Sequence, residues 1–333
     1  MSKITLSKLG LGAGPLGGNY DSFDSDTPVE TLKTAFEKGI NWLDTSPYYG
    51  NSETVVGQAL EKISLEHPRE SFYISTKIGR YGYFKKDFDY SAIRTRMSVM
   101  SSLEKLKTSY LDFVYCHDVE FVDLDQVTDC ALPELFKMKQ EGIIKNVGIS
   151  GYPLDVLLKI AEIQHKKGQP LDQVLSYCHA NLHNQQAIPI IPILRSYGVK
   201  YVFMASPLSM GLLRSQDPPK WHPANSELKS AVTNCIEYMS ANNCDPVEVA
   251  MTYAFDISFS SQEDNNNADG YVVGMLGKDQ VLSSVSALTN TLKLSNGDDN
   301  NQCNPKMAAC LEQIKKIMAP FQDYTWESPP ADA

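Results

Sequence analysis

Short apolar runs recur along the whole chain and predict eight β-strands. They are rich in β-branched, aromatic or Leu residues, and neither face of a run is consistently polar. Such runs are typical of a parallel sheet whose two faces are both covered. The predicted strands are Leu9–Leu16, Ile40–Thr45, Phe72–Thr76, Leu111–His117, Asn146–Ser150, Gln173–Cys178, Lys200–Ser206 and Gly270–Met275.

Segments with the period of an amphipathic α-helix separate these runs. Gly39 and Gly142 follow two of them, where a glycine commonly ends a helix. The predicted helices are Pro28–Lys38, Ser52–Lys62, Ser91–Lys107 (with apolar Ile93, Met97, Met100 and Leu103), Gln126–Gln140, Pro153–Lys166, Gln186–Ser196, two across Asn225–Phe255, and Pro305–Met318. Because βα units follow one another without a linker, we expect a single α/β domain over residues 1–333, a (β/α)8 TIM barrel.

Three segments interrupt this rhythm. QEDNNNAD (262–269) and SNGDDNNQCN (295–304) are polar and rich in Asn, so we expect mobile surface loops there. The C-terminal tail, 321–333, contains paired prolines and is predicted to be a loop.

Charge and cysteine usage narrow the class of partner. The net charge of −10 disfavours nucleic acid and anionic membranes, which bind clustered Lys and Arg. The start of the chain lacks the apolar region of a signal peptide, and no apolar run reaches the roughly 20 residues that span a bilayer. Seven scattered cysteines predict free thiols in a reducing cytoplasm. Cys178, His179 and His183 lack a partner pair for a tetrahedral site, so we expect no metal.

A glycine motif, Gly12-Ala-Gly14-Pro-Leu-Gly17, matches the GxGxxG pattern of dinucleotide-binding folds. In those folds the helix begins inside the glycines, so that its amides hold the pyrophosphate. Here ten residues, rich in Asp and Ser, separate Gly17 from the first predicted helix. We therefore interpret the glycines as a closely packed first strand and turn.

Four polar residues stand at or near the ends of three consecutive predicted strands. They are Asp44, Tyr49, Lys77 and His117. Taken singly, each has an ordinary structural explanation: a turn cap, surface cover, a solvated strand end, and a core histidine. Together they lie at the strand C-termini, the face of a barrel that carries active sites. The sequence therefore predicts a catalytic group there.

The chemistry of the four residues is coherent. A Tyr hydroxyl, with an ordinary pKa of about 10, serves as acid or base when a nearby cation favours its phenolate. Lys77 can supply that cation, Asp44 can hold Lys77, and His117 can orient a substrate oxygen. This group suits proton transfer at a carbonyl or hydroxyl. Since no side chain takes a hydride, a nicotinamide must do so.

The segments LDTSPYYG, STK and YCHD resemble the tetrad signatures of the aldo-keto reductase family, and the strand order agrees over nearly the whole chain. Longer segments, among them STKIGRYG, IIKNVGISGYPLD and MASPLSMGLLR, resemble the branch of fungal NAD-dependent D-arabinose 1-dehydrogenases and plant L-galactose dehydrogenases. The resemblance implies oxidation of an aldose such as D-arabinose, L-galactose or L-fucose at C1 to its lactone, with Tyr49 as proton acceptor.

The resemblance also implies cofactor contacts, at Ser150, Ser206, Leu208, Met275, Lys278 and Gln280. Where the family commonly has Ser-Asn to hold the carboxamide, this chain has Ser150-Gly151, and Ala205 replaces the Tyr that stacks on the nicotinamide in many members. Residues 275–280 supply one Lys and no Arg for a 2′-phosphate, so we expect NAD.

Two alternatives remain open. One is a general NADPH-dependent aldehyde or ketone reductase, and the other is a non-catalytic subunit that senses a nucleotide. An intact tetrad disfavours the second alternative. The expected partner is a small sugar substrate. We expect the protein itself to be a monomer or a weak homodimer.

Overall fold

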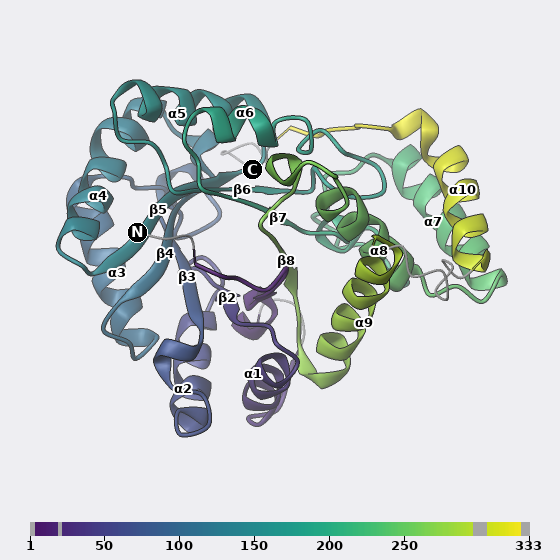
Figure 1. Cartoon of the computed structure of the whole chain (residues 1–333), viewed down its shortest axis with the longest axis horizontal. Coiled ribbons are helices and arrows are strands. Elements are labelled where there is room, and N and C mark those ends of the chain that lie inside the picture. Colours follow the sequence, from purple (N-terminus) through teal and green to yellow (C-terminus); the bar gives the residue numbers. More distant parts are fainter. Residues whose placement is uncertain (1–3, 19–21, 296–304, 328–333) are drawn as a thin grey trace.

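Eight parallel strands close into a barrel in chain order, with β1 pairing β8, as predicted (Figure 1). The computed structural model describes residues 4–18, 22–295 and 305–327. The strands are β1 (Leu9–Gly12), β2 (Trp42–Asp44), β3 (Tyr73–Ile78), β4 (Leu111–His117), β5 (Ile144–Gly151), β6 (Gln173–Tyr177), β7 (Tyr201–Ala205) and β8 (Gly270–Gly274).

Alternate strand residues fill the barrel interior, as the twofold period of a strand requires. Trp42 and Phe113 belong to an aromatic cluster that is separate from the larger apolar core, to which the intervening Leu43 and Val114 belong. Gly10 makes room for this cluster, because a Cβ there would lie 2.4 Å from the Trp42 ring. The inward-facing positions above the aromatic cluster are therefore the ones that reach the barrel mouth.

Helices surround the barrel (Figure 1). They are α1 (Thr27–Glu37), α2 (Ser52–Ile63), α3 (Ala92–Lys105), α4 (Leu132–Gln140), α5 (Leu154–Lys166), α6 (Ile191–Ser196), α7 (Ser226–Ala241), α8 (Pro246–Phe259), α9 (Gly277–Ser295) and α10 (Pro305–Met318). The helix α9 is not predicted from the sequence pattern. Its core-facing stripe mixes apolar Val281 and Ala287 with Ser284 and Thr291, which hides the apolar period.

Several predicted boundaries shift where a proline intervenes. Strand β1 ends at Gly12 rather than Leu16, and a 3₁₀ turn with Pro15 follows it. Helix α6 begins at Ile191 rather than Gln186, since Pro189 lacks an N–H and disfavours helix before it. Residues Gln126–Ala131 form a π-helical segment that leads into α4.

Three of the four apolar positions predicted for this helix face solvent in α3, which the helical period alone does not predict; the fourth, Leu103, packs against the core. Ile93, Met97 and Met100 are 77%, 57% and 49% exposed. The face of α3 that packs inward carries Val99 with Thr95, Ser98 and Ser102. The helix thus lies on the barrel through small, partly polar side chains.

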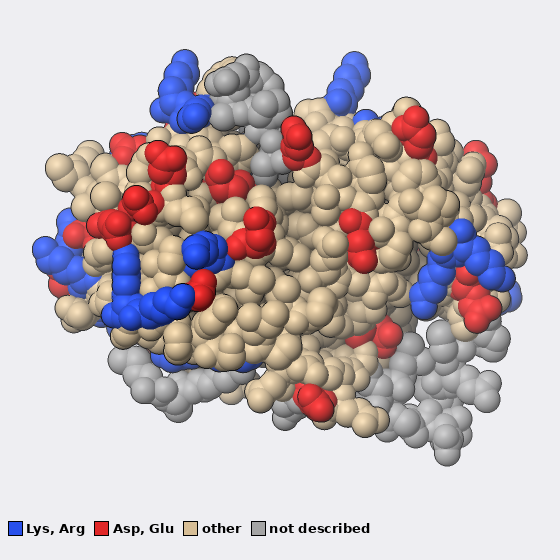
Figure 2. Space-filling view, turned by 90° about the horizontal axis from the view of Figure 1, so that it is seen from above, with Lys and Arg blue, Asp and Glu red and all other residues tan. Residues whose placement is uncertain are grey.

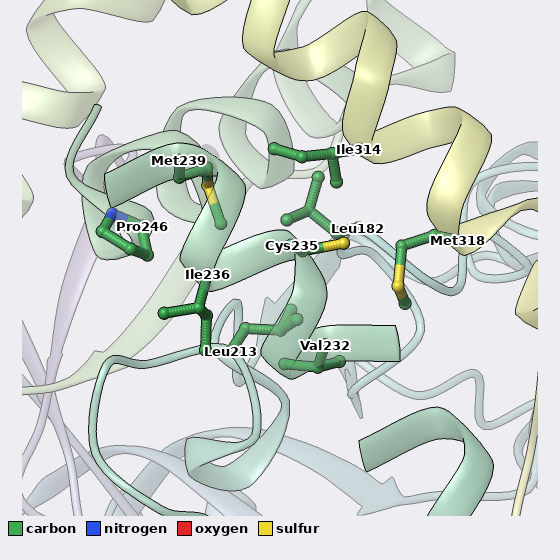
Figure 3. A pocket seen from close by; sticks show the side chains of 9 residues that line it. All are labelled: Leu182, Leu213, Val232, Cys235, Ile236, Met239, Pro246, Ile314 and Met318. Carbon is green, nitrogen blue, oxygen red and sulfur yellow. The ribbon is translucent and has the colours of Figure 1, made fainter. Parts of the chain in front are cut away.

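A second apolar cluster lies at the end of the molecule where α7 and α10 run side by side (Figure 1). Figure 3 shows Ile314 and Met318 of α10 facing Val232, Cys235 and Met239 of α7. The cavity between them has a volume of only about 10 Å³, too small for a ligand. The two helices are therefore closely packed.

The described part of the C-terminal tail returns from α10 to the barrel (Figure 1). The Asp323 carboxylate accepts a hydrogen bond from the Gln185 amide at 2.9 Å, and the Asp323 amide donates one to the His183 carbonyl at 2.7 Å. The Trp326 ring stacks on Tyr152, with centroids 5.4 Å apart. This part of the tail is a loop, as predicted, and it is packed against the barrel.

The two polar segments differ in how far the structure describes them. Residues 262–269 form a loop that is exposed in its first half and buried at Ala268. Reciprocal hydrogen bonds between Ser261 and Asn267 close this loop. The second predicted loop lies outside the described residues from position 296 onward. On the face in Figure 2, positive and negative side chains are interspersed and neither forms a continuous patch. In the described segments we find no helix with the length and apolar character of a membrane span.

Candidate active site

The strand register brings three of the four predicted catalytic residues to the mouth of the barrel. Asp44 is the last residue of β2, Lys77 the penultimate residue of β3, and His117 the last of β4. Each follows the interior aromatic cluster at an inward-facing position. Adjacent strands therefore place three polar groups side by side, each less than 6% exposed.

Lys77 and Asp44 form a buried ion pair, in which the Lys77 ammonium donates to the Asp44 carboxylate. Lys77 Nζ also donates to the Thr45 carbonyl at 2.9 Å, and Ser75 Oγ donates to the second Asp44 oxygen at 2.5 Å. A buried ion pair is stable only when further hydrogen bonds satisfy its remaining atoms, as they do here. The pair is thus held in one geometry.

Tyr49 reaches the same point from the loop after β2. Its amide donates to the Ser46 carbonyl at 3.0 Å, and its carbonyl accepts from the Ser52 amide at 3.1 Å. Lys77 Nζ lies 4.8 Å from the centroid of the Tyr49 ring. Unlike the other three, Tyr49 is half-buried, so a substrate can approach it.

The glycine turn after β1 supports the Tyr49 loop, which confirms the packing interpretation of the glycine motif. A Cβ on Gly17 would lie 2.0 Å from the Tyr49 carbonyl oxygen, so only glycine fits. Ser52 Oγ donates to the Ala13 carbonyl at 2.7 Å and bonds Thr45 Oγ1 at 2.8 Å. The turn, the loop and the start of α2 are therefore tied together.

The His117 ring stands perpendicular to Tyr49, at a centroid distance of 5.7 Å and an angle of 89°. Ser46 Oγ is 3.1 Å from His117 Nδ1. Burial lowers the pKa of His117 well below its usual value, and the charges of Lys77 and Arg80 lower it further. His117 is therefore a neutral imidazole, able to donate one hydrogen bond and accept another.

A second buried ion pair adjoins His117 and is not predicted from the sequence. Arg80 donates to the Asp118 carboxylate, and its other terminal nitrogen donates to the Tyr48 hydroxyl at 2.9 Å. Asp118 Oδ2 lies 3.5 Å from His117 Nε2. Two features of the sequence could have suggested this pair: an Asp directly follows His117, and an Arg lies three residues after Lys77. Their pairing depends on the left-handed φ of 53° at Asp118, which a strand pattern does not reveal.

Ser150 lies beside His117, since the two residues are partners in the β4–β5 register. Its hydroxyl is buried, and within the described part of the chain it has no hydrogen-bond partner. A buried hydroxyl in this state favours a ligand with amide or carbonyl groups. The carboxamide of a nicotinamide offers both, so the residues present fit this group.

The other predicted cofactor residues lie at the ends of β7 and β8. Ser206 follows β7 with a φ of 62°, and Leu208 is partly buried in the same loop. Met275 is fully buried, so its side chain is a packing group; its amide donates to the Gly12 carbonyl at 3.2 Å. Lys278 and Gln280 are exposed in the first turn of α9. Gln280 Oε1 accepts from the Leu276 amide at 2.9 Å, and this bond orients its side chain.

Of two tyrosines in loops near the barrel mouth, Tyr48 contacts the catalytic group and Tyr81 packs elsewhere. The Tyr48 ring contacts His117 at a centroid distance of 5.8 Å, whereas Tyr81 packs under Arg94 and accepts from the Gly79 amide.

Comparisons with known proteins identify the family of this chain. The family model described as the aldo/keto reductase family matches residues 8–304. The chain is 36% identical over 327 residues to L-galactose dehydrogenase of Arabidopsis thaliana, covering 98% of this chain and 94% of that protein. It is 42% identical over 255 residues to D-arabinose 1-dehydrogenase of Saccharomyces cerevisiae, with 75% of each covered.

A solved structure shares the fold. The aldo-keto reductase of Bacillus halodurans superposes with a TM-score of 0.66 and 22% identity, over 97% of this chain and 95% of that one. With the closed eight-stranded barrel and the family match over most of the chain, the conclusion is plain: this chain belongs to the aldo/keto reductase family.

Proposed function

We propose that this protein is an NAD-dependent oxidoreductase that oxidises an aldose, D-arabinose or a related sugar such as L-galactose or L-fucose, at C1 to the lactone. The observation that carries the proposal is the convergence of Tyr49, Lys77, Asp44 and His117 at one barrel mouth. Two relatives that cover three quarters or more of the chain are named as dehydrogenases of aldoses, which favours a sugar as the substrate.

Tyr49 is the proton acceptor in this proposal. Its ring lies beside the Lys77 ammonium, and a phenolate that forms on loss of the Tyr49 proton is stabilised by that charge. Asp44 and Thr45 keep Lys77 oriented toward this task. The C1 hydroxyl of the sugar therefore gives its proton to Tyr49 as C1 is oxidised.

His117 positions the sugar. A neutral imidazole at the mouth can hydrogen-bond the C1 oxygen without adding a charge that competes for the proton of Tyr49. Ser46 at Nδ1 and Asp118 near Nε2 restrict the orientation of the ring. His117 thus holds the reacting oxygen near Tyr49.

Ser150, Ser206, Leu208, Met275, Lys278 and Gln280 would hold the nicotinamide nucleotide, with Ser150 at the carboxamide and residues 275–280 at the adenosine end. When bound, the nicotinamide supplies the hydride acceptor that the side chains lack. A 2′-phosphate calls for an Arg fork or a Lys close by; the first turn of α9 has no Arg, and its one cation, Lys278, is exposed beside Asp279. NAD is therefore preferred over NADP.

Steady-state assays with a panel of aldoses and both nucleotides test the proposal. We expect NADH formation with one or more of D-arabinose, L-galactose and L-fucose, at a rate about 10²–10⁴-fold lower in a matched Tyr49→Phe protein at the same concentration. Turnover of aldehydes alone with NADPH would instead identify a general reductase. Nucleotide binding without turnover of any substrate would identify a sensing subunit.

A further inference from the structure

Two cysteines far apart in the sequence meet at the joint between α10 and the α7–α8 turn. Cys244 and Cys310 are 66 residues apart, and their sulfur atoms are 2.9 Å apart. Both are free thiols, and Cys310 Sγ donates a hydrogen bond to Cys244 Sγ. Sequence spacing gives no sign of this pair, because neither residue belongs to a CxxC motif.

The backbone around Cys244 is held in place by local hydrogen bonds. Asn243 adopts a left-handed φ of 55°, which turns the chain after α7, and the Cys244 amide donates to the Met239 carbonyl at 2.9 Å. Asp245 then caps α8 by accepting from the Glu248 amide at 2.8 Å. Cys244 is thus fixed on a short, closed turn.

Cys310 is fixed by packing. It is a buried member of the second apolar cluster, to which Ile314 and Met318 of α10 and Cys235 of α7 also belong (Figure 3 shows these three residues). Because a disulfide needs its two Cβ atoms within a narrow range of separation, pairs on mobile segments rarely meet the requirement. Here both partners are already held with their sulfur atoms in contact.

The two thiols differ in access to solvent. Cys244 is partly exposed, whereas Cys310 is buried. Burial, together with the smaller effect of the contact with Cys244, raises the pKa of Cys310 to about 11. A small oxidant in solution therefore meets Cys244 first. Cys310 then lies directly behind it as the second thiol.

We propose that Cys244 and Cys310 are a redox modification site, at which hydrogen peroxide forms a reversible intramolecular disulfide. Cys244 sulfur attacks peroxide, the O–O bond breaks, and a sulfenic acid and one water form. Cys310 sulfur then attacks the sulfenic sulfur, the S–O bond breaks and a second water leaves. In total, two thiols lose two electrons and two protons, and one peroxide becomes two waters.

The disulfide would fasten the C-terminal part of the chain to the barrel. Without it, α10 is attached by the apolar cluster and by the tail contacts of Asp323 and Trp326. Closing a loop of this length stabilises a native fold mainly by restricting the unfolded chain. We expect oxidation to raise Tm by about 3–8 °C.

To test this proposal, the purified full-length protein is treated with a small excess of hydrogen peroxide. The remaining thiols are then blocked under denaturing conditions, and the peptides are mapped by mass spectrometry. We expect the thiol count to fall from seven to five, with a peptide that links Cys244 to Cys310, a higher Tm, and reversal by dithiothreitol. Cys310→Ser should abolish the linked peptide and the Tm shift.

Cys130→Ser is the matched control, because Cys130 is exposed and lies outside the α10 joint. This variant should still form the linked peptide and show the rise in Tm, with its thiol count falling from six to four. Peroxide that consumes thiols without producing the linked peptide would overturn the proposal. So would a linked peptide whose formation leaves Tm unchanged or lowers it, since the bond would then be incompatible with native packing. Neither readout depends on catalytic activity.

Discussion

The barrel mouth and the α7–α10 end of the molecule are built on different principles. At the mouth, buried polar groups such as Lys77 and Asp44 are fixed by strand register and by hydrogen bonds. At the other end, the helices pack through an apolar cluster, and the tail hydrogen-bonds back to the barrel at His183 and Gln185. Substitutions at the mouth should therefore change turnover, whereas changes at the α7–α10 end should change stability.

The largest effect is expected at Tyr49. Tyr49→Phe removes the proton acceptor and leaves the ring packing intact, so turnover should fall by about 10²–10⁴-fold with NAD binding near normal. Steady-state kinetics and nucleotide titration measure the two quantities. Tyr48→Phe is the neighbouring control and should keep far more activity, because the Tyr48 hydroxyl is bonded to Arg80. Near-normal turnover of a folded Tyr49→Phe protein would remove Tyr49 from the mechanism.

A smaller effect is expected when the Tyr49 loop is displaced rather than altered. Gly17→Ala places a Cβ against the Tyr49 carbonyl, so the loop must move, and turnover should fall by about 10–10²-fold. Gly14→Ala is the matched control, since its Cβ would meet the Tyr49 ring at an ordinary 3.7 Å. Equal activity of the two variants would show that the position of this loop does not limit the reaction.

The histidines beneath the tail predict loss of stability in acid. Burial lowers the pKa of His179 and of His183 to about 4. The unfolded chain binds protons at these histidines below about pH 6.5, whereas the folded chain does so only below about pH 4. The free energy of unfolding is therefore unaffected by these histidines above pH 6.5, and it decreases as the pH falls below 6.5. At pH 5 the loss is roughly 2 kcal/mol per histidine.

Urea denaturation between pH 7 and pH 5 measures this loss. His183→Asn should make the free energy of unfolding less dependent on pH, although it lowers stability at pH 7. His165→Asn, at an exposed position, should leave the pH dependence as it is in the wild type. A His183→Asn protein with the wild-type pH dependence would contradict the assignment of this effect to the buried histidines.

The smallest effect is expected at Lys278. Because Lys278 is exposed, Lys278→Ala should change kcat/KM for NAD by less than about fivefold. Wild-type kcat/KM should be higher with NAD than with NADP. The opposite preference, abolished selectively by Lys278→Ala, would mean that this single cation binds a 2′-phosphate.

Sequence patterns predict the barrel well because each strand is a local apolar run, and strand ends share one face of the barrel. Asp44, Lys77 and His117 could therefore be grouped before their positions were known. The Arg80–Asp118 pair could not, because it depends on one left-handed residue.

Sequence patterns also fail to predict features that depend on packing between distant parts of the chain. The helical period of α3 identifies an apolar stripe without revealing that Ile93 and Met97 face solvent. The sequence of the tail likewise does not indicate that Trp326 stacks on Tyr152, a residue 174 positions earlier in the chain. Periodicity describes one element at a time, and such contacts join distant ones.

The position at which the sugar is oxidised tests the proposed function most directly. The measurement uses an aldose labelled with deuterium at C1, together with NAD, and determines by mass spectrometry where the label goes. We predict that one deuterium appears in the reduced nucleotide, with the unlabelled lactone as product. Reduced nucleotide that carries no deuterium, formed while the sugar keeps its label at C1, would contradict oxidation at C1 by this group of residues.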